Sequence, residues 1–525
     1  MIRVLLVFIL FGSMFINCGL FQEYLNRPKM YFLIITSMAL LLGCFITRGG
    51  VQKLVDSLKS RKLLNGVTIV CLLVLVHGFL QYFKVMPSYH RSFPITGMFE
   101  NPAGFITVLA AMFPFVLSRS FDGNNGRFPQ FFSIVVSVLC VVSVILADSR
   151  TGFLAMCAAF AVFLAFTDTV SSFLKKHRWI WLPVLILAVI MVVLLYYIRQ
   201  DSADGRVFIW KRSFELIKEH PIFGYGIGGF HTNYMRAQAD YFRANPDSPY
   251  TMIADNVTHP FNEYIKLTVN YGLVGLIIGI TLLVLIVRKL LKSDKQTKVM
   301  GLSFVASVFV MCQFSYPYQY SVMWLLSIYA IAPAFLKTGK EIVIPTYIRT
   351  IVSILLIGGL GFSLVRMYYE MKWTEIAKRS LRGRAGRMMP YYEDVNRVMG
   401  HYPMFLYNYA AELNVLEQFD ESLEVLSKCS DKWSEYNVQL LYIDNYFKLG
   451  QLDKALEACD EANMMVPSRF GPIYRKMLIY MMQKDTVNAT RMANEILDKP
   501  IKIQSEELDR MVFAAESLIN LYEGE

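Results

Sequence analysis

Charged residues are scarce in this sequence. Only 18% of its 525 residues are Asp, Glu, Lys or Arg, whereas 55% are hydrophobic and the mean hydropathy is +0.40. A chain this long and this apolar exceeds what one water-soluble core can bury. The composition therefore predicts an all-α, polytopic membrane protein.

Two further patterns are missing. The eight cysteines are scattered singly, mostly in or beside apolar runs, where cysteine behaves as a small hydrophobic residue. They form neither a disulfide framework nor a zinc motif. The formal net charge of +11 comes from short basic clusters between apolar runs, as in membrane proteins whose cytoplasmic loops are basic. This distribution argues against a nucleic-acid partner.

Membrane spans can be counted from the apolar runs, because a helix needs about 17 to 25 mostly apolar residues to cross the hydrocarbon core. The opening run is retained as the first span, because it lacks a small-residue cleavage site and a second run follows it. Eleven spans are predicted in total: 4–21, 30–47, 63–83, 101–117, 128–147, 151–167, 179–198, 267–287, 299–315, 319–336 and 350–365.

The basic residues also predict the orientation. One alternate set of loops contains eighteen Lys and Arg residues and the opposite short loops contain five, so the first set is expected to be cytoplasmic. Met1 is then cytoplasmic. The outer face receives residues 86–100, the short link Asp148–Arg150, the long loop 199–266 and everything after the last span. We therefore expect a bacterial inner-membrane protein whose C-terminal domain is periplasmic.

The segment after about residue 371 is soluble in character and repeats. Tyr446 and Tyr480 are 34 residues apart, as are Ala455 and Ala489. This spacing resembles the tetratricopeptide repeat. We expect two domains, a membrane domain over 1–370 and a tetratricopeptide-like helical domain over 371–525. Stacked helix pairs of this kind suit a peptide or protein partner, and a stabilising cap without a ligand is an equal alternative.

The predicted spans contain almost no ionisable groups besides Tyr, Cys and His77. A transporter would be expected to carry such groups near the middle of the membrane. The polar residues gather instead in the outer segments, where the head group of a lipid-linked substrate would lie. This placement favours an enzyme that acts on its substrate at the membrane surface.

Three residues in these outer segments carry suitable chemistry. Arg150 lies in the short link "ADSRTG", Arg206 in "DSADGRVFIWKRSFELIKEHPIFGYGIGGF", and His259 in "THPFNEY" directly before an uncharged span. Two arginines can bind a diphosphate through bidentate hydrogen bonds. A histidine that titrates near neutral pH can take a proton from an acceptor hydroxyl.

Each of these residues also has a structural interpretation. Arg150 could be an interfacial anchor, Arg206 could pair with a nearby aspartate, and His259 could be a solvated loop residue. Asp204 or Gly205 is expected to cap a helix whose apolar face carries Val207, Trp210, Phe214 and Ile217. The glycine-rich "GYGIGG" follows no strand, so we interpret it as a turn rather than a phosphate-binding loop.

The motifs "GRVFIWKRSFELIKEHPIFGYGIGGF" and "THPFNEYIKLTVNYGLVGLIIGI" resemble the O-antigen ligase and polymerase superfamily, which includes bacterial protein O-oligosaccharyltransferases. The resemblance covers roughly the first 340 residues. It implies transfer of a pre-assembled glycan from undecaprenyl diphosphate, with Arg150 and Arg206 on the donor diphosphate and His259 as the catalytic base. The family commonly places a histidine immediately before the asparagine. In this sequence Phe261 precedes Asn262, and His259 lies three residues before Asn262.

The resemblance leaves the acceptor open among a lipid A core sugar, another glycan repeat, and Ser or Thr of an exported protein. A membrane-anchored repeat scaffold without enzymatic activity is a further alternative. Asn262, Glu263 and Tyr264 are possible supporting residues. The outer loops between the predicted spans contain no Asp-x-Asp or Glu-x-Asp pair. We therefore predict a transferase that needs neither a metal nor another cofactor, and whose partners are the lipid-linked donor, its acceptor and membrane lipid.

Overall fold

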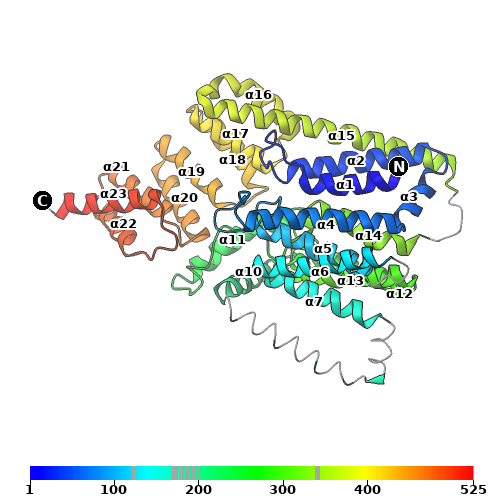
Figure 1. Ribbon diagram of the computed structural model, residues 1–525. Helices are drawn as coiled ribbons and strands as arrows, with labels where there is room; N and C mark the ends of the chain where they lie inside the picture. Colours follow the sequence, from blue (N-terminus) through cyan, green and yellow to red (C-terminus); the bar gives the residue numbers. More distant parts are fainter. Residues whose placement is uncertain are drawn as a thin grey trace. The chain divides into compact units, whose positions relative to one another are not determined.

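The computed structural model describes residues 1–120, 126–167, 200–336 and 343–523, together with a few isolated residues between 168 and 199. Helices and turns make up the described residues (Figure 1). Seven helices are long and apolar enough to cross a membrane, and three shorter apolar helices accompany them. The chain is therefore an all-α, multi-pass membrane protein.

Ten of the eleven predicted spans coincide with a helix. Seven of them fall on the long candidate spans. The predicted spans 4–21, 151–167 and 319–336 fall on the shorter helices Ile2–Phe15, Arg150–Ala165 and Val322–Phe335. The predicted span 179–198 lies outside the described residues, apart from isolated positions.

Contacts between Cα atoms divide the chain into two compact units. Unit 1 contains residues 1–195, 261–263 and 278–374. Its helices are α1 (Ile2–Phe15), α2 (Arg27–Ile46), α3 (Gly50–Leu58), α4 (Arg61–Tyr82), α5 (Pro102–Ser120), α6 (Arg127–Leu146), α7 (Arg150–Ala165), α13 (Lys295–Phe314), η2 (Pro317–Gln319), α14 (Val322–Phe335) and most of α15 (Thr346–Arg379).

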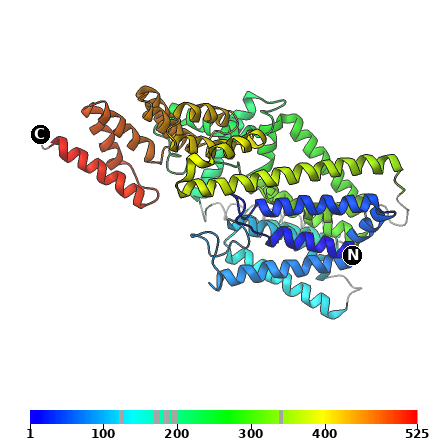
Figure 2. The same cartoon turned by 90° about the horizontal axis from the view of Figure 1, so that it is seen from above.

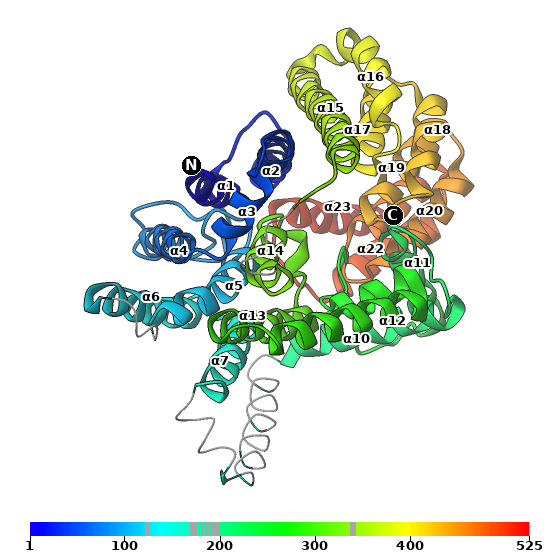
Figure 3. The same cartoon turned by 90° about the vertical axis from the view of Figure 1, so that its right-hand side faces the viewer.

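Helix α5 is the centre of unit 1. Helices α4, α6, α7, α13 and α14 pack around it, as the view along the helices shows (Figure 3). Every residue of α5 from Gly104 to Ser120 is buried. An apolar helix surrounded by other helices needs no polar face, which explains why α5 shows no amphipathic pattern.

Helix α15 runs antiparallel to α2 along the edge of unit 1 (Figure 2). At one end Arg349 donates to the carbonyl oxygens of Phe45 and Ile46, both at 2.8 Å. At the other end the Tyr31 hydroxyl donates to the buried Glu370 carboxylate at 2.7 Å, and Arg27 pairs with the same carboxylate at 3.3 Å. These polar contacts hold together two helices whose remaining surfaces are largely apolar.

Unit 2 combines the long polar segment with the C-terminal helices. It contains residues 196–260, 264–277 and 375–525. Its helices are α10 (Gln200–Glu219), α11 (Gly229–Ala244), η3 (Ser380–Arg384), α16 (Ala385–Met399), α17 (Pro403–Val415), α18 (Phe419–Ser430), α19 (Tyr436–Lys448), α20 (Leu452–Met465), α21 (Gly471–Met482), α22 (Thr486–Asp498) and α23 (Glu506–Glu523).

The C-terminal helices of unit 2 pack in consecutive pairs, α17 with α18, α19 with α20 and α21 with α22. Ala455, Ala462 and Ala489 are fully buried. Small side chains at these positions allow the paired helices to approach closely. The region is therefore helical as expected. The tetratricopeptide assignment and the domain boundary at residues 370 and 371 stay predictions.

Helix α12 (Glu263–Leu291) contributes to both units and is broken at Gly272, which has a φ of 62° and a ψ of −162°. Because of the break, four backbone groups lack the hydrogen-bond partners that they would have in a continuous helix. The "HPIFGYGIGG" segment supplies other partners for them. Leu273 and Val274 donate to the carbonyl oxygens of Pro221 and Ile222 at 2.8 and 3.2 Å.

The exchange is reciprocal. The carbonyl oxygens of Val269 and Asn270, which a continuous α12 would direct to Leu273 and Val274, accept instead from Tyr225 and Gly226 at 3.0 and 2.7 Å. Near lipid an unsatisfied backbone group costs several kcal/mol. The predicted "GYGIGG" turn is confirmed, and its role is to complete the hydrogen bonding of a broken transmembrane helix.

Candidate active site

Helix α10 carries Arg206 and packs one face against α11. Phe208 is buried on this face, and its ring lies 5.5 Å from that of Phe242 and 4.8 Å from that of Tyr250. The buried positions of α10 are Phe208, Ile209, Ser213 and Leu216. Arg206 itself is half-buried.

One expectation for α10 is wrong. Asp204 and Gly205 do not cap the helix, because both lie inside α10 (Gln200–Glu219). The predicted apolar face also contains Phe214, whose surface is 51% exposed. Apolar residues surround much of this helix, so the sequence pattern alone is ambiguous. Packing against α11 selects the face that contains Phe208 and Leu216.

The segment that carries His259 is attached to α10. The Trp210 indole N–H donates to the Pro260 carbonyl oxygen at 2.8 Å. Arg206 precedes Trp210 by one helical turn, so the two side chains project from the same side of α10. The structure therefore places Arg206 and His259 on neighbouring, directly bonded segments of unit 2.

His259 lies beside a second histidine, His231, at the start of α11. The two ring centres are 5.5 Å apart and the ring planes are nearly perpendicular, at 80°. Burial, reinforced by Lys266, lowers the pKa of His231 to about 4. Burial, then Lys266 and His231, lowers the pKa of His259 to about 3. Both imidazoles are therefore neutral at physiological pH.

The C-terminal helices hold the residues just before His259. The Asn256 amide donates to the Glu435 carboxylate, which also caps α19 by accepting from the backbone of Asn437 and Val438. The Asp255 carboxylate pairs with Arg469 at 3.0 Å. These contacts fix the approach of the chain to His259 from inside unit 2.

Gln238 adds a further connection across unit 2. Its buried side chain donates to the carbonyl oxygens of Asp255 and Met465 at 3.1 and 2.6 Å. Gln238 belongs to α11, and Met465 is the last residue of α20. The His259 segment, α11 and the C-terminal helices therefore share one hydrogen-bond network.

Arg150 belongs to unit 1, where it is the first residue of α7. Only three residues, Ala147–Ser149, link α6 to α7, and the Ser149 hydroxyl caps α7 by accepting from the Gly152 amide at 3.2 Å. Arg150 is half-buried at this helix start. Because Arg150 and Arg206 belong to different units, a shared diphosphate site stays a prediction.

The three supporting residues lie at the start of α12. Asn262 is buried, and its amide donates to the Gln313 main-chain carbonyl at 3.2 Å, which gives it a structural contact within unit 1. Glu263 is the first residue of α12. The Tyr264 carbonyl accepts from Thr268, and its phenol carries no assigned role here.

Sequence reasoning missed His231 and Lys266. Both lie in the predicted outer segment, His231 two residues after the glycine-rich turn and Lys266 four residues after Asn262. The sequence shows only a second histidine and a lone lysine in the same polar segment. This pattern does not indicate that either residue lies beside His259. Across the described ranges, no three His, Cys, Asp or Glu residues are grouped as metal ligands. The metal-free mechanism stays a prediction.

The long apolar helices and the polar segment attached to them define a polytopic, all-α membrane protein. Within it, residues 135–280 match the family model described as O-antigen ligase. This matched region includes Arg150, Arg206, His231 and His259, and it ends just after the break in α12. No curated protein matches the chain.

Proposed function

We propose that this protein transfers a pre-assembled glycan from undecaprenyl diphosphate to an acceptor hydroxyl at the periplasmic face of the inner membrane. The observation that carries this proposal is the O-antigen ligase match over residues 135–280, which contain both arginines and His259. Family likeness implies glycosyl transfer from a lipid-linked donor. The acceptor is a lipid A core sugar, a glycan repeat or a protein hydroxyl.

In this mechanism the acceptor oxygen attacks the anomeric carbon of the first sugar while the bond from that carbon to the diphosphate breaks. His259 takes the hydroxyl proton, and undecaprenyl diphosphate leaves with the bonding electrons. Arg150 and Arg206 stabilise the negative charge that develops on the diphosphate. Lys266 adds a third positive charge close to the two histidines.

The low pKa of His259 has a direct consequence for this role. A base with a pKa of about 3 is always available in its neutral form but binds a proton weakly. An adjacent diphosphate favours the protonated imidazole and so raises the pKa of His259. Donor binding would thereby make His259 a stronger base, and burial would keep its imidazole neutral until the donor binds.

The first test concerns the arginines. Arg206→Lys retains the charge but removes bidentate geometry, so we expect it to lose most of its transfer activity in proteoliposomes that contain the lipid-linked donor. Lys218→Gln, an exposed change on the same helix, is the matched control. Normal turnover in both Arg150→Ala and Arg206→Ala would show that neither side chain contacts the diphosphate.

A second test concerns His259. We expect His259→Ala to bind the donor normally while transfer falls by about 100- to 10,000-fold, the usual contribution of a general base. His231→Gln tests the neighbouring histidine by itself, because in this mechanism His259, and not His231, takes the proton. A wild-type rate for His259→Ala would place the base elsewhere. Loss of donor binding would instead make His259 a diphosphate ligand.

The orientation is tested by fusion to alkaline phosphatase, which is active only outside the cytoplasm. Fusions after Asp247 and at the C-terminus are expected to be active, and a fusion after Lys292 is expected to be inactive. The opposite pattern would place the proposed site in the cytoplasm, where it could not meet a periplasmic acceptor.

A further inference from the structure

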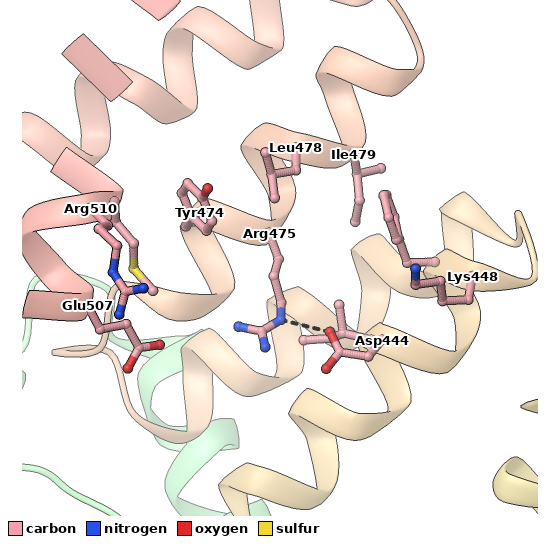
Figure 4. Close-up of a pocket in the computed structure, with 11 residues that line it drawn as sticks. Asp444, Lys448, Tyr474, Arg475, Leu478, Ile479, Glu507 and Arg510 are labelled. Atoms are coloured by element: carbon pink, nitrogen blue, oxygen red, sulfur yellow. Dashed lines mark hydrogen bonds and ion pairs between the residues drawn. The ribbon is translucent and has the colours of Figure 1, made fainter. Parts of the chain in front are cut away.

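A cavity of about 510 Å³ lies among α19, α21 and α23 of unit 2 (Figure 4). Its apolar lining includes Phe447, Tyr474, Leu478 and Met511. A volume of this size falls in the usual range for ligand pockets, about 300–1,000 Å³. The catalytic proposal makes no use of this cavity.

A second cavity, of about 310 Å³, adjoins the first. Both are lined by Arg475, Glu507 and Met511, so the two cavities share a wall. The second also reaches Asp255 and Lys502. We call these two adjoining cavities together the α19–α23 groove; their linings run from the C-terminal helices to Asp255.

The far end of this groove is close to the proposed base. Asp255 precedes His259 by four residues, which span at most about 14 Å even when fully extended. The Asp255 carboxylate is already paired, with Arg469 at 3.0 Å and Lys502 at 3.4 Å. A chain lying in the groove could therefore reach His259 with only a few further residues.

The charges of the groove favour an acidic ligand. Asp444 neutralises Arg475 at 3.1 Å. Lys448 and Arg510 are exposed, form no ion pair within the described part of the chain, and lie on opposite sides of this pair in Figure 4. Glu507 is the one remaining acidic group in the first cavity. The first cavity thus presents two positive charges, Lys448 and Arg510, against one acidic group, Glu507, and the Asp444–Arg475 pair and apolar side chains lie between them.

We propose that the α19–α23 groove binds an extended, acidic peptide segment of an exported protein and directs its Ser or Thr hydroxyl toward His259. Aliphatic and aromatic side chains of the peptide would contact the apolar lining, and its carboxylates would pair with Lys448 and Arg510. An apolar lining suits peptide side chains better than a heavily hydroxylated sugar chain. This inference rests on the proposed transferase activity and selects the protein acceptor.

The test uses the full-length protein in lipid nanodiscs and a fluorescein-labelled peptide built from three Asp-Leu-Ser-Glu repeats, with fluorescence anisotropy as the readout. The Lys448→Glu, Arg510→Glu double variant is expected to weaken peptide binding about tenfold, because two exposed ion pairs become repulsive. Arg491→Glu, an exposed change on α22 outside the groove, is the matched control. A peptide with Lys in place of Asp and Glu should bind poorly.

Transfer to the same peptide provides the second readout. We expect the double variant to raise KM for the peptide about tenfold, by the same loss of ion pairs. Equal peptide affinity in the wild type and the double variant would overturn the inference. So would groove-dependent binding of anionic lipopolysaccharide core oligosaccharide in place of peptide.

The same assays separate this inference from the proposed function. Wild-type protein that glycosylates lipid A core but not the peptide would leave the transferase proposal intact and refute the peptide groove. Wild-type protein that consumes no undecaprenyl-diphosphate donor with any acceptor would refute the transferase proposal itself. Peptide binding that depends on Lys448 and Arg510 would then still identify a peptide-binding surface.

Discussion

Gly272 is the residue at which substitution should most directly test the structure of the broken helix. Its φ of 62° and ψ of −162° lie in a region that is essentially restricted to glycine. A Cβ atom at this position would overlap the backbone of Ile222 and Phe223. Gly272→Ala therefore cannot be accommodated by moving a flexible side chain.

The cost of Gly272→Ala has two parts. The backbone strain amounts to about 1–3 kcal/mol. Displacing the backbone at Ile222 also breaks the hydrogen bond from Val274 to the Ile222 carbonyl and the bond from Leu273 to the neighbouring Pro221 carbonyl, at about 1 kcal/mol each. We expect a total loss of roughly 3–5 kcal/mol. For a unit of this size that lowers Tm by about 10 °C.

The assay is thermal unfolding of detergent-purified variants, with two glycine controls. Gly226→Ala isolates backbone strain, because Gly226 has a φ of 85° but open space around its Cβ position, so about 1–2 kcal/mol is expected. Gly361→Ala lies in α15 with open space and ordinary helical geometry, and should be neutral or slightly stabilising. Equal Tm values for the Gly272 and Gly361 variants would refute the proposed exchange of hydrogen bonds.

Two further predictions concern the histidines and their support. The pKa values of His231 and His259 are lowered in the folded state, whereas a histidine in the unfolded state has a pKa near 6.5. The unfolded state therefore binds more protons as the pH falls. The free energy of unfolding should be at its maximum above about pH 6.5 and lower by roughly 2 kcal/mol per histidine at pH 5. Melting curves at pH 7.5 and pH 5 check this, and a wild-type pH dependence in the His231→Gln, His259→Gln double variant would contradict it. Asn256→Ala removes a hydrogen-bond donor to the buried Glu435 carboxylate and should cost about 1–3 kcal/mol. Hydrogen exchange at residues 254–260 should then accelerate, and unchanged protection would show that this contact does not support the His259 segment.

Much of the architecture follows from local properties of the sequence. Apolar runs long enough to cross a bilayer must form helices there, because only intrahelical bonds satisfy an isolated segment's backbone. Ten of the eleven predicted spans accordingly coincide with helices, although three of those helices are shorter than a full span. The glycine-rich turn was also predicted, because no strand precedes it.

Features that depend on distant partners required the tertiary structure. The sequence did not indicate which face of α10 is buried, because apolar residues surround the helix and only contact with α11 selects Phe208. The pairing of His231 with His259, 28 residues apart in sequence, leaves no local pattern. The attachment of Asn256 to Glu435 joins segments 179 residues apart.

The sequence by itself thus determined the class of protein, most of its helices and the candidate residues for the proposed chemistry, because hydrophobicity and side-chain type are local properties. Only the tertiary structure decided which histidine accompanies His259, and that "GYGIGG" completes the break at Gly272. It alone also showed that the α19–α23 groove ends at Asp255. These features depend on burial and on contacts between remote segments, which have no counterpart in the order of the residues.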